Sequence, residues 1–172
     1  AGACVQVGCA AGFSNCDGDI TNGCEVDHAT PQNSCTILPE NLGVHCGDSL
    51  CGSGCPTSGP FAVAATRTGN RARWFKVRMN DCSPCGGTGE LLQHFVRLDM
   101  PAGINYDLIV YTSCTKLKAV STNEQNSSEE AVVTFSDRED QGDSRDYLIE
   151  VRYIEGQACD PWTLRLVTRP CP

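Results

Sequence analysis

An antiparallel β-sandwich behind an irregular, disulfide-rich N-terminal segment is the fold that the sequence predicts. The first observation is the cysteine content, thirteen in 172 residues, which is typical of cross-linked proteins from an oxidising compartment. The second is the alternation of short β-prone runs with turn clusters from residue 61 onward, the pattern of a sandwich or barrel. The third is that no window shows a 3.6-residue apolar period, so we expect little helix.

The N-terminal segment, residues 1–55, holds eight of the thirteen cysteines. Its large apolar residues are few and follow no period, and so short a stretch buries too little surface to fold without cross-links. Disulfides, at roughly 2–4 kcal/mol each, would take the place of a core. We therefore expect irregular, turn-rich structure over 1–55, a linker at 56–60, and the sandwich domain over 61–172.

Eight strands are expected in the sandwich domain. Apolar and polar residues alternate clearly in several of them, so that Phe75, Val77 and Met79 share one face, while Lys76 and Arg78 share the other. Turn residues separate the runs. The predicted strands cover 61–67, 73–80, 91–99, 106–112, 117–122, 130–136, 145–154 and 162–169.

The formal net charge of −8 argues against nucleic acid or an anionic membrane surface as a partner, because both attract basic patches. No apolar run approaches the ~20 residues of a membrane span, so we expect no membrane insertion. The sequence begins at Ala1 without a signal peptide, as a mature secreted chain or a fragment of one would. We therefore expect a secreted, extracellular protein.

Cysteine pairing can be predicted at three places. Cys82 and Cys85, between a strand and a Gly-rich turn, favour a local structural disulfide over a redox motif; zinc, the other alternative, would need more paired cysteines or spaced histidines. Cys114 and Cys159 each follow a strong strand, so a disulfide between them would join two loops at one end of the sandwich. Because the cysteine count is odd, at least one is left over. Cys171, between two prolines near the C-terminus, is the candidate for a long-range or intermolecular bond.

Five stretches occur in an order that resembles the bacterial pre-peptidase C-terminal domain, over about residues 65–169. They are Arg73-Trp74-Phe75-Lys76-Val77, Val96-Arg97-Leu98-Asp99-Met100-Pro101-Ala102-Gly103, Tyr106-Asp107-Leu108-Ile109-Val110-Tyr111, Asp146-Tyr147-Leu148-Ile149-Glu150-Val151 and Pro161-Trp162-Thr163-Leu164-Arg165-Leu166. The resemblance implies a sandwich of jelly-roll type, of the kind found on secreted hydrolases and on peptidases in particular.

The resemblance does not extend to a calcium site. Calcium-binding members of that family carry an acidic pair just before the Trp-Phe, where this sequence has Asn70-Arg71-Ala72-Arg73, so their calcium site does not transfer. A second resemblance lies in the N-terminal segment. The stretch from Phe13 to Asp19, with Asn22-Gly23-Cys24-Glu25 after it, resembles a cysteine-rich repeat of large secreted bacterial proteins.

Oxygen-bearing side chains alternate in one N-terminal loop, at Asn15, Asp17 and Asp19, and Glu25 follows. Alternate oxygen ligands in a tight loop are typical of Ca²⁺ sites, and extracellular modules bind with Kd of about 10⁻⁴–10⁻³ M. The spacing departs from an EF-hand because Gly18 stands at the fourth position. We hypothesise weak Ca²⁺ binding here and predict no other cofactor. The alternative is a disulfide loop whose side chains cap turns.

No motif of a hydrolase, metalloprotease or phosphate-binding loop is present. His94 lies on a strand face with Leu92 and Val96 and is expected to be a packed or edge histidine. His45 adjoins Cys46, but a Cys–His pair needs a free thiol, and we expect Cys46 to be bridged. The sequence therefore predicts a protein that is not an enzyme.

Two functions remain. The first is a non-catalytic extracellular structural or interaction protein, such as a subunit of a surface or fibre-like assembly, which associates with itself or with another extracellular protein. The second is an accessory module of a larger secreted hydrolase that binds substrate or Ca²⁺. The length of the parent reading frame distinguishes them, because a catalytic domain upstream of Ala1 would establish the second.

Overall fold

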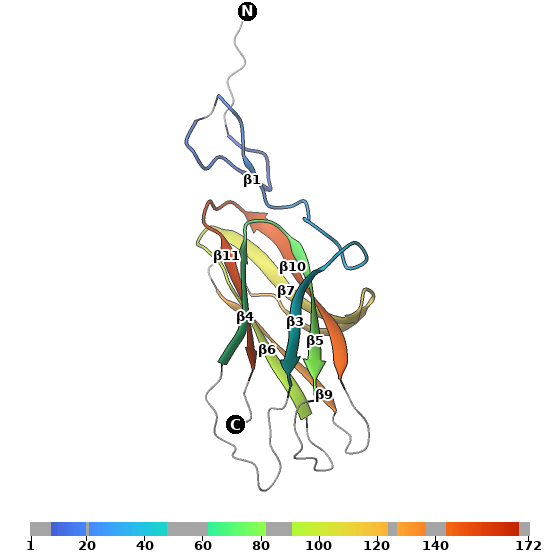
Figure 1. Cartoon of the computed structure of the whole chain (residues 1–172). Coiled ribbons are helices and arrows are strands. Elements are labelled where there is room, and N and C mark those ends of the chain that lie inside the picture. The colour runs from blue at the N-terminus through green and yellow to red at the C-terminus, as the bar shows by residue number, and fades with distance from the viewer. Residues whose placement is uncertain are drawn as a thin grey trace, which may run out of the picture.

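Two stacked sheets form the body of the molecule, and a small two-stranded sheet sits at one end of it (Figure 1). The computed structural model describes residues 8–19, 21–47, 62–81, 91–123, 127–136 and 144–168. These residues form strands and no helix. The described part of the chain therefore has no helix with the length and apolar character needed to cross a membrane.

The five-stranded sheet has the order β3 (Glu40–Cys46), β5 (Arg73–Asn80), β10 (Arg145–Gly156), β7 (Ile104–Ser113), β8 (Lys116–Ser121). The four-stranded sheet has the order β4 (Ala62–Gly69), β11 (Trp162–Thr168), β6 (Leu91–Asp99), β9 (Glu129–Ser136). The small sheet pairs β1 (Phe13–Ser14) with β2 (Val26–Asp27). Neighbouring strands are antiparallel except β3 and β5, which are parallel. The predicted all-β sandwich is confirmed.

Alternation of apolar and polar residues located the strands of the sandwich well. The expected ranges 73–80 and 91–99 are those of β5 and β6. On β5 the side chains of Phe75, Val77 and Met79 are fully buried, while Lys76 and Arg78 are exposed. A strand that lies between a core and solvent needs this two-residue period, so the period reflects the fold directly.

The core lies between the two sheets and is continuous. Phe75 of one sheet meets Trp162 of the other edge to face, with ring centroids 6.2 Å apart. Full burial of each such side chain contributes roughly 1.5–3 kcal/mol. The fully buried large side chains are Trp162, Tyr106, Tyr147, Phe75, Met79, Leu92, Leu98, Ile104, Leu108, Ile149, Leu164 and Leu166.

The expectation of irregular structure throughout residues 1–55 is wrong at β3. This strand runs parallel to β5 at the edge of the five-stranded sheet, so the sandwich begins before the boundary placed at residue 55. Only Leu42 of the strand is buried, and the register shifts beside Gly43, whose φ is 104°. One buried side chain and a bulge leave no two-residue period to detect. The expected linker at 56–60 lies outside the described residues.

The predicted disulfide between Cys114 and Cys159 is also wrong. Cys35 pairs with Cys114, and Cys16 pairs with Cys159. The reason is the antiparallel pairing of β7 with β10, in which the end of one strand lies beside the start of the other. The two loops that follow these strands are therefore at opposite ends of the sheet. Each reaches a cysteine of the N-terminal segment instead.

Candidate functional site

The tip loop, residues 34–38, presents apolar side chains to solvent. Leu38 is 85% exposed and Ile37 is 68% exposed. Among the described residues, Leu38 is the only non-glycine residue with a positive φ, 49°. The left-handed conformation costs roughly 1–2 kcal/mol for a residue with a Cβ. Backbone strain of this kind clusters at active sites and ligand-binding positions. It therefore marks the tip loop as a candidate functional site.

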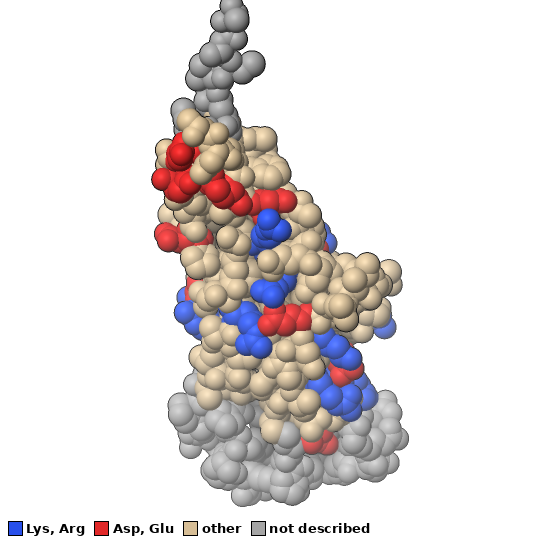
Figure 2. Space-filling view, turned by 45° about the horizontal axis from the view of Figure 1, so that its top comes forward, with Lys and Arg blue, Asp and Glu red and all other residues tan. Residues whose placement is uncertain are grey.

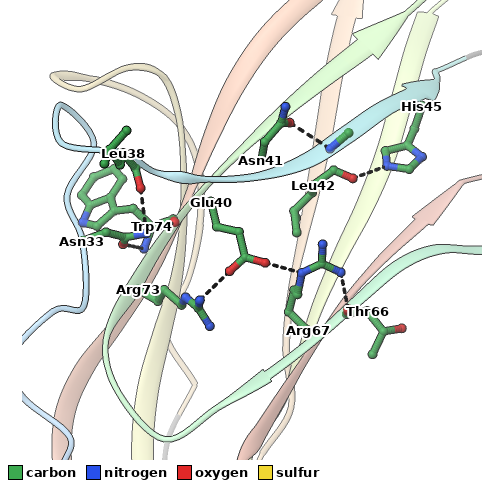
Figure 3. Close-up of polar contacts among 11 residues, drawn as sticks. Asn33, Leu38, Glu40, Asn41, Leu42, His45, Thr66, Arg67, Arg73 and Trp74 are labelled. Carbon is green, nitrogen blue, oxygen red and sulfur yellow. Dashed lines mark hydrogen bonds and ion pairs between the residues drawn. The ribbon is translucent and has the colours of Figure 1, made fainter.

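Several contacts fix the tip loop in place. Cys35 within it is bonded to Cys114 in the turn between β7 and β8. The Ile37 amide donates to Ser34 Oγ at 3.0 Å. Asn33 Nδ2 donates to the Leu38 carbonyl at 3.3 Å (Figure 3). A preformed loop loses little conformational entropy when it binds, so rigidity at this position favours binding.

A groove runs beside the tip loop and reaches the start of β5. It combines the apolar tip with two guanidinium groups and one carboxylate. Its main lining residues are Asn33, Ile37, Leu38, Glu40, Arg71 and Arg73.

Glu40 of β3 lies between two arginines from different strands (Figure 3). Its Oε2 is 2.6 Å from Nη2 of Arg73 on β5, and its Oε1 contacts Nε of Arg67 on β4. These ion pairs link the edges of the two stacked sheets. One carboxylate faces two cations here, so the cluster keeps an excess positive charge.

Side chains satisfy backbone groups along this edge of the sandwich. The Gly43 amide donates to Asn41 Oδ1 at 2.9 Å, and His45 Nε2 donates to the Leu42 carbonyl at 2.9 Å (Figure 3). Arg67 Nη1 donates to the carbonyl of its neighbour Thr66 at 2.8 Å. An edge strand whose backbone groups are already bonded to side chains is a poor template for pairing with another strand. A partner at this edge would therefore be held by side chains rather than by β-augmentation.

The acidic knob, residues 15–19 and 21–25, holds the residues predicted to bind Ca²⁺. Asn15 Oδ1 accepts from the Gly18 amide at 2.8 Å, and Asp17 Oδ1 accepts from the Asp19 amide at 2.8 Å. Asp19 Oδ1 accepts from the amide and the hydroxyl of Thr21. These are the turn-capping contacts of the alternative interpretation.

Hydrogen bonds favour the charged form of the Asp17 and Asp19 carboxylates. The Asp19 amide, and then the Asn22 side chain, lower the pKa of Asp17, and the Thr21 hydroxyl and amide lower the pKa of Asp19. Glu25 Oε2 accepts from the Cys16 amide at 2.9 Å. Within the residues that the structure describes, no three His, Cys, Asp or Glu side chains are arranged to hold a metal ion. Calcium binding stays a prediction.

The acidic knob is joined firmly to the end of the sandwich. The Cys16–Cys159 disulfide ties it to the loop between β10 and β11. His28 Nδ1 donates to the Asn70 carbonyl at 2.6 Å, so Nε2 accepts the hydrogen bond of the Ser14 hydroxyl at 2.8 Å. This Ser–His pair has the connectivity of a hydrolase dyad. Both side chains are buried, so the pair presents no nucleophile to solvent and serves as an attachment.

The other predicted residues divide into two groups. His94 is fully buried, in agreement with the first of the two alternatives, and Cys46 is disulfide-bonded as expected. Cys82, Cys85 and Cys171 lie outside the described residues.

Leu38 and Glu40 were not predicted as site residues. The only local signal for the tip loop was an apolar pair within a polar, cysteine-rich stretch, because exposure and backbone strain leave no mark on the sequence.

The chain matches no protein-family model and no curated protein. Its function must therefore be inferred from the geometry of the tip loop, the groove and the acidic knob.

Proposed function

We propose that this chain is a non-catalytic extracellular interaction protein that serves as a subunit of a surface or fibre-like assembly. The observation that carries the proposal is Leu38, held 85% exposed with a φ of 49°. Strain of this kind persists where the surroundings enforce it, and it clusters at ligand-binding positions. Here the exposed side chain of Leu38 would supply an apolar contact for a partner.

The disulfides support the extracellular part of the proposal. The structure contains the disulfides Cys9–Cys24, Cys16–Cys159 and Cys35–Cys114. Such bonds persist in oxidising compartments. The interaction role is supported by the fixed tip loop and by the capped edge strands beside it. These features make a rigid surface that associates through side chains.

The test compares self-association of the wild type with that of two Leu38 variants by analytical ultracentrifugation. Leu38→Gly and Leu38→Asn remove the apolar side chain, and both residues tolerate positive φ. We expect each to weaken association at least about tenfold without lowering stability, because the strain is relieved. Leu117→Asn is the matched control, since Leu117 is 57% exposed on β8. A wild-type protein that sediments as a monomer at high concentration would contradict the proposal.

The second candidate, an accessory module of a secreted hydrolase, has one supporting observation. Strands β4 to β11 form a sandwich over the residues that resemble the pre-peptidase C-terminal domain, which is the architecture the resemblance implies. The parent reading frame tests this candidate directly. A hydrolase domain encoded upstream would favour it over the assembly subunit.

A further inference from the structure

Charge is distributed unevenly along the chain. All thirteen Lys and Arg residues follow residue 66, and the first is Arg67. The acidic knob carries Asp17, Asp19 and Glu25 without a cation. Figure 2 shows acidic side chains gathered at one end of the molecule, and basic side chains with some acidic ones over the sandwich beside it. One end of this face thus carries acidic side chains without basic ones, while the sandwich carries both signs.

The groove provides the basic counterpart. Arg71 and Arg73 line it, Arg67 lies beside it, and Glu40 is the acidic residue among them. Arg71 also lowers the pKa of Asp27 through its charge, although hydrogen bonds from Thr30 do so more strongly. The groove is therefore locally positive on a chain whose formal net charge is −8.

We propose that copies of this chain join head to tail, with the acidic knob of one copy seated in the groove of the next. Asp17 and Asp19 would face Arg71 and Arg73, while the tip loop covers the apolar side chains beside the acidic knob. The inference rests on the proposed function, for which it names the partner and the two contact surfaces.

The acidic knob can make these contacts while its own turns stay intact. A carboxylate has about four lone-pair sites, and the loop contacts of Asp17 and Asp19 occupy only part of them. Both residues have lowered pKa values, so they remain ionised in mild acid. Phe13, 36% exposed on β1, offers an apolar surface next to the acidic knob.

Geometry favours a neighbouring copy over the chain's own groove. The Cys16–Cys159 disulfide holds the acidic knob at the end of the sandwich, whereas the groove is lined by residues of the segment 31–40 and by Arg71 and Arg73. The two surfaces differ, so the contact is heterologous. Contacts of this type form a ring if the rotation closes and an open filament if it does not.

The experiment uses one variant for each surface. Asp17→Asn, Asp19→Asn and Glu25→Gln combined remove the charge of the acidic knob and keep an acceptor oxygen at each position. Arg71→Glu reverses a charge in the groove and leaves the Glu40 ion pairs untouched. Lys116→Glu on β8, at the far edge of the five-stranded sheet from β3, is the matched control. Thermal unfolding checks that each variant is folded.

We expect either surface variant alone to self-associate at least about tenfold more weakly than the wild type, since each lacks one side of the contact. An equimolar mixture of the two should form a one-to-one complex and nothing larger, because one intact acidic knob still meets one intact groove. The Lys116→Glu control should assemble like the wild type.

Other results would overturn the inference in distinguishable ways. If the wild type assembles and both surface variants assemble equally well, the head-to-tail contact is wrong and the proposed function stands. The contact is equally wrong, and the proposed function again stands, if both variants are monomeric and their mixture forms no complex. If the wild type itself is monomeric at high concentration, the proposed function fails together with the inference.

Discussion

The side chain of Asn33 binds both backbone polar groups of Trp74. Its Oδ1 accepts a hydrogen bond from the Trp74 amide at 2.7 Å, and its Nδ2 donates to the Trp74 carbonyl at 2.9 Å. A neighbouring strand would make this pair of contacts, and the pairing of β3 with β5 begins at the next residue, Phe75. Asn33 therefore extends the sheet edge and ties the tip loop to it.

Asn33→Ala should destabilise the protein by about 1–3 kcal/mol, because it leaves part-buried backbone groups of Trp74 without partners. Equilibrium unfolding in denaturant measures the loss. Asn41→Ala, which removes one exposed contact to the Gly43 amide, is the control and should cost less than about 1 kcal/mol. Equal losses of stability in the two variants would show that the Asn33 contacts to Trp74 contribute no more than the exposed contact of Asn41.

Stability should fall between pH 6.5 and 4 through His94. Burial lowers the pKa of His94 to about 4, below the value of about 6.5 expected in the unfolded chain. The unfolded state then binds more protons in this interval, so the His94 contribution is complete above pH 6.5 and is lost on acidification. The loss amounts to about 3 kcal/mol at most.

His94→Gln isolates this effect. His94 Nε2 donates to the Cys46 carbonyl and Nδ1 accepts from the Tyr147 hydroxyl, and a glutamine amide can do both without titrating. The variant should lose less stability than the wild type when the pH is lowered from 6.5 to 4. Parallel pH profiles of the two proteins would refute the assignment.

Peptide mapping without reduction should recover Cys35 linked to Cys114 and Cys16 linked to Cys159. Replacing Cys35 and Cys114 by serine should cost about 2–5 kcal/mol, as the loss of a native disulfide does in small secreted domains. It should also weaken self-association, because the tip loop is no longer fixed. A peptide that links Cys114 to Cys159 would show that the described pairing is incorrect.

Glu40→Gln should destabilise the protein by about 1–2 kcal/mol, between the values for exposed and buried ion pairs. The carboxylate is part-buried and contacts Arg67 and Arg73, which would be left facing each other. Asp99→Asn is a matched control among the more exposed ion pairs, since Asp99 also faces two arginines, Arg97 and Arg165. Chemical denaturation at low and high salt should show a larger salt dependence in the wild type than in Glu40→Gln.

The strands of the sandwich were predictable because each has one face in the core. The two-residue period of β5 and β6 reflects that arrangement directly. Strand β3 was not predictable, since Leu42 is its only buried residue and its partner β5 is parallel. The same holds for Cys114 and Cys159, because their partners depend on how strands distant in the sequence are arranged.

The candidate site residues divide in the same way, into those with a local sequence pattern and those that distant parts of the chain bring together. Asp17 and Asp19 were found from their spacing, which the turn contacts explain. Leu38, Glu40 and Arg73 were not predicted as site residues. They line one groove because β3, which follows the tip loop and has no apolar period, pairs with β5. Surface sites that are assembled in space from single residues leave no local pattern.

The disulfides that hold the acidic knob and the tip loop have a consequence for how the protein is made. Cys16 and Cys159 are 143 residues apart, and Cys35 and Cys114 are 79 apart, whereas Cys9 and Cys24 are only 15 apart. As the chain emerges amino end first, the early cysteines meet one another long before their partners have been synthesised. The native set then requires late thiol–disulfide exchange, which takes seconds to hours without help. Production of this protein should therefore depend on a disulfide isomerase in the compartment where it matures.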